Sequence, residues 1–525
     1  MSRILFVALA ALAFVVGVGV AIGSDGDGGG GGDDKPKIPT WPAVERAPAS
    51  QAKDKPNIVF IYSDDQNASD FKRRFMPLTY DRLVDGGTNF SNFVVAAPVC
   101  CPSRVGFMTG DYPHNSGVYM NHDGFPSMRA KEQNIGSWMQ RAGYHTAWLG
   151  KFLQGYKRVI PDPNVPAPGW DSWQVSLRAN YFGWELYTNH GTQRGGASDY
   201  YTDTLTNRAS RLVTKQLGKR RPLFMVLNEL APHKGHGGHG SCANTAAPAP
   251  RDYGKFADEP LPRPPSFNEP DRSDKTAFVA EGELGKLAIR QDRDRYRCRL
   301  ETLQAMDRGI ARIYDAVKRE GEIDNTIFVF TSDNGLLIGE HALDGKDIPY
   351  EEGIRMPMAL RVPKQLLGKA PVGQIGDLTA NIDLTPTLLE LAGADPCLSD
   401  DDCRTLDGRS LTPLLRGNSI GWPADRAIPI EGGVRGDVCG FRGLRLKASV
   451  LLEDVVAADE GTCVQSNEPE YYDLDADPYQ LDNLLVTDPQ KASGTVDELL
   501  ARMEQLQSCS GIEGRDPPTP GGFCD

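Results

Sequence analysis

The chain has 525 residues, of which 40% are hydrophobic and 24% charged, an ordinary composition for a globular protein with enough material for two domains and an enclosed active site. Its formal net charge of −13 argues against a general binder of nucleic acid or of anionic membranes. Any anionic substrate must therefore be attracted by a local cluster of cations.

The N-terminus begins with an apolar, uncharged run over residues 4–22. Small residues at its end suit signal cleavage, but at about 1.5 Å per residue the run also nearly spans a bilayer. We interpret residues 1–23 as a signal peptide or an N-terminal anchor, so we expect a secreted or cell-surface protein that contacts the membrane only if the run is retained. Residues 24–54, rich in Gly, Asp and Pro, are predicted to be a flexible linker.

A run of β-formers at residues 57–62 predicts a buried strand of a parallel sheet, and two aspartates follow it. A second such run, at residues 326–330, is followed by an Asp-Asn pair. One aspartate pair after a strand is as often a turn former as a ligand, but the recurrence favours ligands. Oxygen ligands select Ca²⁺ or Mg²⁺ over zinc or copper. The predicted ligands are Asp64, Asp65, Asp333 and Asn334.

The segment Cys-Cys-Pro-Ser-Arg at residues 100–104 follows the first strand. Pro102 fits the first turn of a helix, which places the Cys100 side chain at a helix N-terminus, where free N–H groups and the helix dipole favour an anion. Arg104 adds a fixed positive charge. The alternative is an ordinary buried cysteine pair before a helix, because a five-residue pattern is short.

Strands and helices alternate through the middle of the chain. Further strands are predicted at residues 146–149, before Lys151, and at residues 223–227, before His233. Alternating strands and helices indicate a layered α/β domain, in which polar residues at strand ends build the site. The predicted helices are 135–142, 204–217, 293–320 and 382–391.

The character of the sequence changes near residue 415, where shorter β-like runs, more cysteines and polar turns begin. We therefore predict a catalytic domain over residues 55–415 and a smaller C-terminal domain over residues 416–525, with a strand at residues 470–474.

Together these motifs resemble the type I sulfatases, in which the first cysteine of Cys-x-Pro-Ser-Arg is oxidised to Cα-formylglycine by a formylglycine-generating enzyme. The resemblance covers nearly all of residues 55–484. It implies an alkaline-phosphatase-like α/β fold with a large mixed, mostly parallel sheet between helices, plus a smaller C-terminal α+β domain with an antiparallel sheet.

The resemblance also implies roles for individual residues. One hydroxyl of the aldehyde hydrate formed from Cys100 attacks the sulfate ester, and the other later expels sulfate by re-forming the aldehyde. The hydrate also contacts the metal, Ca²⁺ or Mg²⁺, which acts as a Lewis acid. Lys151 and Lys346 bind sulfate oxygens, and His233 or Lys346 protonates the leaving alcohol. The implied catalytic residues are Cys100, Arg104, Lys151, His233 and Lys346.

One position departs from the family pattern. Many sulfatases have a histidine two residues after the lysine that corresponds to Lys151, where this chain has Leu153. Either another histidine substitutes for it or this subgroup does without it. The three substitutes considered are His114, His145 and His341.

Segments at residues 168–173, 265–269, 296–301 and 350–355 resemble the N-acetylglucosamine-6-sulfatase branch. The expected substrate is therefore the 6-O-sulfate of N-acetylglucosamine or of a related sulfated saccharide. Two alternatives stay open: a phosphodiesterase or phosphonate monoester hydrolase of the same superfamily, and a non-catalytic binder of sulfated glycans if Cys100 is never oxidised. Four aromatic residues have either a sugar-stacking or a core role: Trp170, Trp173, Tyr181 and Trp184.

Ten cysteines are present, so conversion of Cys100 leaves an odd number. Export makes disulfides plausible, and the spacing leaves Cys101 as a buried free thiol. The pairs predicted are Cys242 with Cys298, Cys397 with Cys403, Cys439 with Cys463, and Cys509 with Cys524.

Overall fold

The computed structural model describes residues 41, 44–276, 279, 282–433, 438–459, 462–465 and 468–525. These residues belong to one compact unit, Ile38–Asp525. The predicted signal or anchor and most of the predicted linker lie outside them. Among the described residues, no helix is both long and apolar enough to cross a membrane. The predicted domain boundary near residue 415 stays a prediction.

A ten-stranded sheet forms the centre of the structure, in the order β13-β2-β12-β9-β1-β8-β4-β5-β6-β7. The neighbours β9, β1, β8, β4 and β5 all pair in parallel, whereas β12, β6 and β7 pair antiparallel to their neighbours. This confirms the predicted large, mixed and mostly parallel sheet. The strands are β1 (Asn57–Ser63), β2 (Thr88–Phe90), β4 (His145–Lys151), β5 (Ser172–Ser176), β6 (Glu185–Thr188), β7 (Gly191–Arg194), β8 (Leu223–Asn228), β9 (Thr326–Ser332), β12 (Met358–Arg361) and β13 (Gln374–Ile375).

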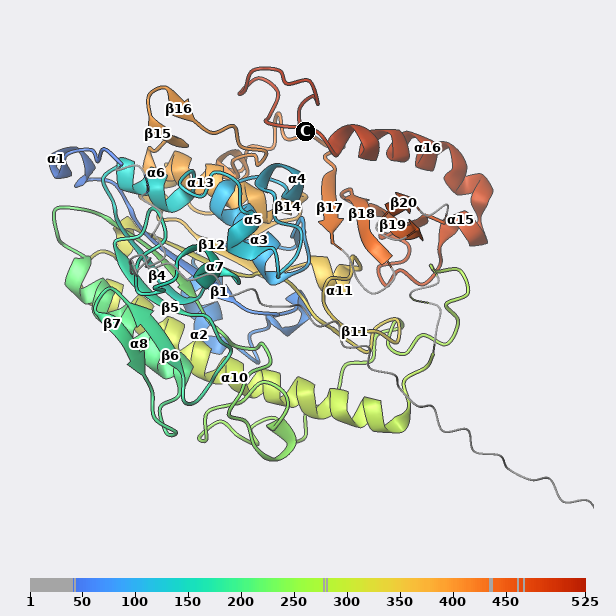
Figure 1. Ribbon diagram of the computed structural model, residues 1–525, viewed down its shortest axis with the longest axis horizontal. Coiled ribbons are helices and arrows are strands. Elements are labelled where there is room, and N and C mark those ends of the chain that lie inside the picture. The colour runs from blue at the N-terminus through green and yellow to red at the C-terminus, as the bar shows by residue number, and fades with distance from the viewer. Residues whose placement is uncertain are drawn as a thin grey trace, which may run out of the picture. The chain divides into compact units, whose positions relative to one another are not determined.

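Helices cover both faces of this sheet (Figure 1). One layer contains α3, α6 and α13, and the opposite layer contains α8 and α10. The predicted helices are confirmed, although α10 begins seven residues before its predicted start, because its first turns are too polar to show apolar periodicity. The bounds are α3 (Cys100–Thr109), α6 (Ile135–Arg141), α8 (Tyr201–Gln216), α10 (Lys286–Arg319) and α13 (Leu384–Ala392).

Strand β1 explains why two layers are needed. Successive side chains of a strand point to opposite faces. Ile58 and Phe60 pack in the hydrophobic core shared with α3, α6 and α13, whereas Val59 and Ile61 pack in the core shared with α8 and α10. All four side chains are fully buried, and each such burial contributes roughly 1.5–3 kcal/mol. A continuous apolar run is thus what a strand covered on both faces requires.

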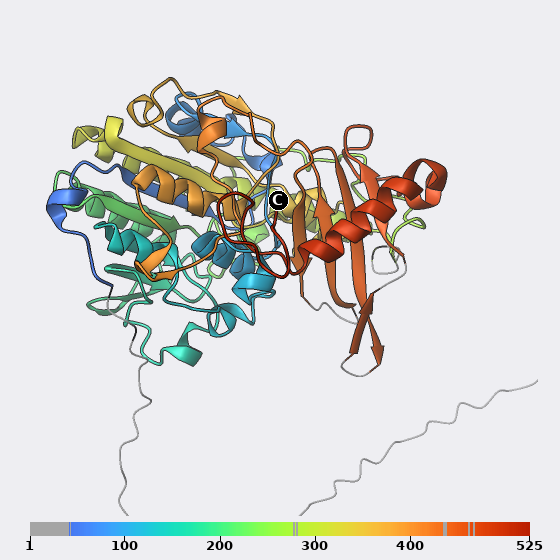
Figure 2. The ribbon, with the colours of Figure 1, turned by 90° about the horizontal axis from the view of Figure 1, so that it is seen from above.

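A second, five-stranded sheet is entirely antiparallel and lies in the C-terminal region. Helix α16 (Pro489–Leu506) runs alongside it (Figure 2). This confirms the antiparallel sheet predicted there. Its strands are β17 (Ile428–Gly432), β18 (Val438–Arg445), β19 (Ser449–Asp459), β20 (Thr462–Gln465) and β21 (Glu470–Asp473).

Short elements connect these layers. The short helices are α1 (Ala49–Ala52), α2 (Pro77–Thr79), α4 (Pro113–Ser116), α5 (Gly124–Ser127), α7 (Tyr156–Val159), α11 (Glu351–Ile354), α12 (Lys364–Leu367), α14 (Thr412–Leu415) and α15 (Leu484–Thr487). The short strand pairs are β3 (Phe93–Val94) with β14 (Thr379–Ala380), β10 (Leu337–Ile338) with β11 (Asp344–Gly345), and β15 (Cys397–Ser399) with β16 (Asp402–Cys403).

Three of the four predicted disulfides form: Cys242–Cys298, Cys397–Cys403 and Cys509–Cys524. The side chains of the fourth predicted pair, Cys439 and Cys463, lie outside the described residues. Cys100 and Cys101 are free and buried, so the prediction that both stay outside the disulfide framework is confirmed.

Candidate active site

The site lies where the carboxyl ends of the parallel strands meet. Residue pairing aligns the ends of β1, β8, β4 and β9, so the segments that follow them leave the sheet at the same edge. Lys151 is the last residue of β4, and His233 lies on the loop after β8. The side chains collected at this edge are Asp64, Asp65, Lys151, His233, Asp333 and Asn334.

Helix α3 brings the cysteine pair to this edge. It begins at Cys100, after Val99 in extended conformation, and Pro102 lies in its first turn, as predicted. Cys100 and Arg104 are one turn apart, so both face the strand ends, and both are buried. Cys101 instead packs in a hydrophobic core, where its Sγ accepts a hydrogen bond from the Gln154 amide at 3.3 Å. The two adjacent cysteines therefore have different environments.

Carboxylates and cations alternate beneath Cys100. Arg104 Nη2 donates to Asp64 Oδ2 at 2.9 Å and lies 2.5 Å from Asp333 Oδ2. Lys151 pairs with the same oxygen of Asp64. Burial acts to raise the pKa of Asp64, but Lys151 and the neighbouring cations hold it well below its ordinary value. Asp64 is therefore ionised in this environment.

Asp65 has its own set of partners. Its Oδ1 accepts hydrogen bonds from Lys346 Nζ at 2.6 Å and from Asn334 Nδ2 at 2.7 Å. Its backbone N–H donates to Asp333 Oδ1 at 3.0 Å, and its φ of 63° lies in the left-handed region, which aspartate tolerates better than most residues. These contacts lock the turn after β1 to the turn after β9.

The Cys100 sulfur lies between two lysines. Lys346 Nζ is 2.8 Å from Sγ, Lys151 Nζ is 3.6 Å away, and Asp64 Oδ1 is 3.7 Å away. Burial raises the pKa of the Cys100 thiol to about 12 in spite of both lysines. An unmodified cysteine here is thus a protonated thiol at neutral pH.

The oxygen donors at this edge suit a hard divalent cation, whereas the Cys100 sulfur and the His233 ring nitrogen are softer donors. One ligand atom from each of Asp64, Asp65, Cys100 and His233 lies within 4.8 Å of the others. In addition, Asn334 Oδ1 is buried without a hydrogen-bond partner, as expected of an oxygen placed to bind an ion. Carboxylate and amide oxygens favour Ca²⁺ or Mg²⁺.

His233 borders the carboxylates from the β8 side. Its Nε2 lies 3.6 Å from Asp65 Oδ2, and its Nδ1 faces the carbonyl oxygen of Lys234. Burial, with Lys151 as the next contribution, lowers the pKa of His233 to about 4. The imidazole is therefore neutral at pH 7 in this arrangement.

A cleft of about 430 Å³ opens above Cys100. Cys100, Lys151, Leu153, His233 and Lys346 are among its lining residues, so the structure brings four of the five predicted catalytic side chains to one solvent-accessible space. The fifth, Arg104, does not line the cleft and is fully buried. Leu153 faces the cleft where the family histidine was expected.

The three candidate substitute histidines are not among the lining residues. His114 contacts Glu431, His145 contacts Ser172, and His341 contacts Glu269. Each is engaged at another place in the fold, so the structure favours the alternative in which this chain does without that histidine.

The four aromatic residues considered for sugar stacking belong to the core. Trp170 and Trp173 pack between the sheet and the α3 layer, and Tyr181 and Trp184 pack on the opposite face. None exposes more than 5% of its surface, and none lines the cleft. A stacking role is therefore wrong, because the hydrophobic effect has placed these large rings inside the protein.

One residue of the site escaped sequence reasoning. Arg299 on α10 is buried, and its Nη2 donates to the Asp65 carbonyl at 2.5 Å and to Asn67 Oδ1 at 3.2 Å. It thereby holds the loop after β1 from below, one residue from the disulfide at Cys298. Residues 296–301, which contain Arg299, carried part of the resemblance, but no role was predicted for Arg299 itself; the other signal was a charged residue among the apolar positions of a helix.

Comparisons with known proteins agree with this geometry. The sulfatase family model matches residues 56–394. The N-acetylglucosamine-6-sulfatase of Homo sapiens is 30% identical over 516 residues, which cover 89% of this chain and 87% of the human protein. The extracellular sulfatase SULF-1 homolog of Drosophila melanogaster is 30% identical over 395 residues, 72% of this chain. The chain spans 33% of that protein and 49% of its Caenorhabditis elegans relative.

Solved structures show the same fold. A protein in complex with its substrate D-glucosamine-2-N,6-O-disulfate superposes with a TM-score of 0.68 at 23% identity, over 86% of this chain and 97% of that one. The phosphonate monoester hydrolase of Agrobacterium radiobacter superposes with a TM-score of 0.64 at 20% identity, over 89% and 99%. The fold alone therefore does not choose between sulfur and phosphorus chemistry.

Proposed function

Because the chain belongs to the sulfatase family, a family of sulfuric ester hydrolases, we propose that it removes the 6-O-sulfate of N-acetylglucosamine or of a closely related sulfated saccharide. The observation that carries this proposal is the position of Cys100. Its sulfur lies at a helix N-terminus, at the floor of a cleft, within 3.6 Å of the ammonium groups of Lys151 and Lys346. An anionic group that reaches the nucleophile is thus met by two fixed cations.

The proposal assigns two groups that the chain acquires. A formylglycine-generating enzyme oxidises Cys100, and the hydrated aldehyde supplies a hydroxyl nucleophile at that position. A divalent cation, Ca²⁺ or Mg²⁺, held by carboxylate and amide oxygens, supplies positive charge against the sulfate oxygens. The residues proposed to hold it are Asp64, Asp65, Asp333, Asn334 and the oxygen that replaces the Cys100 sulfur.

The surrounding side chains have distinct tasks in this proposal. Lys151 and Lys346 hold the sulfate oxygens and orient the ester above residue 100. Arg104 bridges Asp64 and Asp333 and so fixes the spacing of two proposed ligands. Arg299 holds the backbone of Asp65.

A proton must reach the leaving alcohol, because an alkoxide leaves poorly. The two candidates at the cleft are His233 and Lys346. The Lys346 ammonium already carries a proton, because in spite of its burial Asp65 and other anionic neighbours raise its pKa, whereas the neutral His233 imidazole must first take one up. A more reactive aryl sulfate needs less protonation than a sugar sulfate. The residue that acts as the acid is therefore the one whose substitution lowers turnover of the sugar sulfate more than turnover of the aryl sulfate.

Export completes the proposal. The apolar run at residues 4–22 and the disulfides Cys242–Cys298, Cys397–Cys403 and Cys509–Cys524 suit an oxidising compartment. We propose that the protein acts outside the cell on sulfated saccharides.

A substrate panel tests the reaction and the sugar. Matured protein is assayed with N-acetylglucosamine 6-sulfate, N-acetylglucosamine 3-sulfate, an aryl sulfate and an aryl phosphonate. We expect the 6-sulfate to have the highest kcat/KM of the sugars, and both sulfates to exceed the phosphonate. A kcat/KM for the phosphonate far above all the sulfates would instead assign the chain to phosphorus chemistry.

A further inference from the structure

The cleft above Cys100 has more positive charge than one sulfate ester needs. Besides Lys151 and Lys346 at its floor, it is lined by Lys157, Arg158 and Arg178, and no Asp or Glu is among its lining residues. The Lys and Arg residues of the lining thus have no acidic counterpart within it, although the chain as a whole has a net charge of −13. We call these three exposed residues the rim cations.

The rim cations differ in how far they are engaged. Lys157 Nζ donates to the Tyr187 hydroxyl at 2.7 Å and lies 4.5 Å from the centre of that ring. The Arg158 guanidinium donates to the carbonyl of His122. Within the described part of the chain, Arg178 has neither a hydrogen-bond partner nor an ion-pair partner. All of its donors therefore remain available to a ligand.

The backbone that carries Arg178 is held against the catalytic loop. Arg178 follows the carboxyl end of β5, at the same sheet edge as the other site residues. The His236 amide donates to the Ala179 carbonyl at 2.8 Å, and the Tyr181 amide donates to the His236 carbonyl at 3.0 Å. The buried Tyr181 hydroxyl donates to the His233 carbonyl at 2.8 Å. The position of Arg178 relative to His233 is therefore fixed by the main chain.

A fixed backbone and a free guanidinium suit the capture of a second anion. Guanidinium groups bind carboxylates and sulfonates through paired N–H donors, and the bond to an ion is stronger than one to a neutral acceptor. The ester under attack is held by the lysines at the cleft floor, so a cation at the rim is placed for a different group of the same saccharide.

We propose that Arg178 binds a second anionic group of the substrate and thereby selects saccharides that carry one in addition to the sulfate ester. This inference rests on the proposed function. The group is a sulfonate or a carboxylate, and the two sources are an N-sulfonate on the glucosamine ring and the carboxylate of an adjoining uronate. A saccharide whose only anion is the ester leaves Arg178 unpaired.

The test compares three substrates of matured protein: N-acetylglucosamine 6-sulfate, glucosamine 2-N,6-O-disulfate, and a disaccharide that joins 6-sulfated N-acetylglucosamine to a uronate. We expect at least one dianionic substrate to have a kcat/KM about tenfold above that of the monosulfate, the effect of one charge-assisted contact. The substrate that shows the preference identifies the source of the anion. The preference should weaken as ionic strength rises, because Arg178 is exposed.

Variants assign the preference to a residue. The preference is the ratio of kcat/KM for the preferred dianionic substrate to kcat/KM for N-acetylglucosamine 6-sulfate. Arg178→Gln should bring this ratio close to one, and Arg178→Lys should keep part of the preference. Arg220→Gln removes the same charge from another exposed arginine outside the cleft lining and should leave the ratio unchanged. Thermal unfolding of all variants checks that the fold is intact.

The outcomes separate this inference from the proposed function. Equal kcat/KM values for all three substrates in the natural protein would overturn the inference and leave the proposed function standing. A preference that survives Arg178→Gln would also overturn it. Failure to hydrolyse any of the three by protein with an oxidised residue 100 would contradict the proposed function itself.

Discussion

Two clusters of this protein contain similar types of metal-ligating residue but differ in the bonds that those residues form. One is the floor of the cleft, with Asp64, Asp65, Cys100 and His233, and the other joins His114 to Cys509 and Cys524 in the C-terminal region. In each, the potential ligand atoms lie within 4.8 Å of one another. By residue type alone, both are candidates for a metal site.

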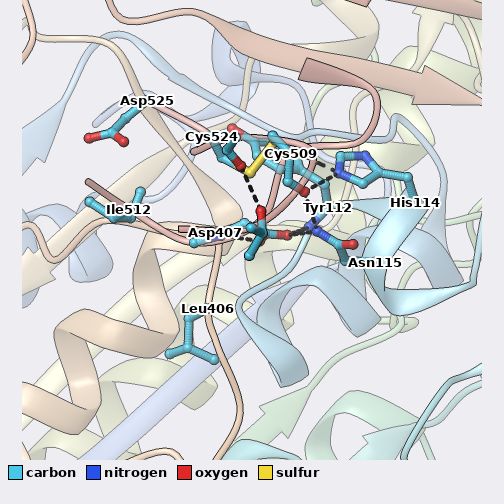
Figure 3. The surroundings of a disulfide bond; sticks show 12 residues. Tyr112, His114, Asn115, Leu406, Asp407, Cys509, Ile512, Cys524 and Asp525 are labelled. Carbon is cyan, nitrogen blue, oxygen red and sulfur yellow. Dashed lines mark hydrogen bonds between the residues drawn. A yellow bond between two sulfur atoms is a disulfide. The ribbon is translucent and has the colours of Figure 1, made fainter. Parts of the chain in front are cut away.

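The bonds already formed distinguish the two. In the C-terminal cluster the two sulfurs are joined to each other, and His114 Nε2 lies 3.1 Å from the Cys509 carbonyl oxygen (Figure 3). The other ring nitrogen, Nδ1, lies 2.6 Å from Glu431 Oε1. Because both ring nitrogens of His114 face acceptors, neither has a lone pair free to bind a metal. We call His114, Glu431 and the disulfide Cys509–Cys524 the clasp, because they tie the C-terminal segment to the rest of the fold. In the cleft the cysteine is free and a buried Asn334 oxygen has no partner. The partners of each atom, more than residue type, decide what a cluster can bind.

The largest contrast is expected between cysteines of the two clusters. Cys100→Ala removes the proposed nucleophile, so we expect kcat/KM for a sulfate ester to fall by roughly 10⁴-fold or more. Cys524→Ala is the matched control and should retain kcat/KM within a few fold. Equal loss in both variants would remove the functional distinction between the clusters.

The next contrast concerns carboxylates. Asp333→Ala deletes a proposed ligand oxygen, and we expect about 10³-fold lower metal-dependent turnover together with less bound Ca²⁺ or Mg²⁺ per chain in elemental analysis. Glu431→Gln, at the clasp, should leave both quantities unchanged. An Asp333→Ala protein that keeps full activity and metal content would refute the ligand assignment.

The disulfide clasp should matter for stability. Cys509 and Cys524 are 15 residues apart, so replacing both by Ala should lower the free energy of unfolding by about 3 kcal/mol in the loop-closure model. Denaturant titration measures the change, and turnover at low temperature serves as the control. A stable double variant that has lost turnover would instead place the clasp in the catalytic machinery.

The smallest expected effect is a pH dependence of the clasp. Burial acts to lower the pKa of His114, but the hydrogen bond and charge of Glu431 raise it overall. A raised pKa in the folded state means that the stabilisation is fully present below the pKa of the unfolded chain, about 6.5, and is lost as pH rises through the folded value. We expect His114→Gln to flatten the pH dependence of unfolding in this range, by about 1 kcal/mol. A profile identical to that of the natural protein would rule out His114 as its source.

Much of the fold was accessible from sequence because local pattern and burial coincide. The apolar run of β1 is buried on both faces, and the polar residues that follow β1, β4, β8 and β9 meet because parallel strands end at one edge. Cys100 and Cys101 were distinguished by their position relative to Pro102.

The rest depends on contacts between distant segments. An exposed arginine such as Arg178 has the same local signature as any solvated arginine, and only the fold shows that it lines the cleft. Arg299 acts through the backbone of Asp65, a contact across 234 residues. Trp173 was as plausible at a sugar as in a core, and the register of β5 with β4 decided it.

The chemical state of residue 100 tests the central claim most directly. Mass spectrometry of the tryptic peptide that contains Cys100, from active protein produced in its natural host, measures that state. We predict the mass of formylglycine or its hydrate at position 100, with Cys101 still a thiol. An unmodified Cys100 thiol in fully active protein would contradict the mechanism.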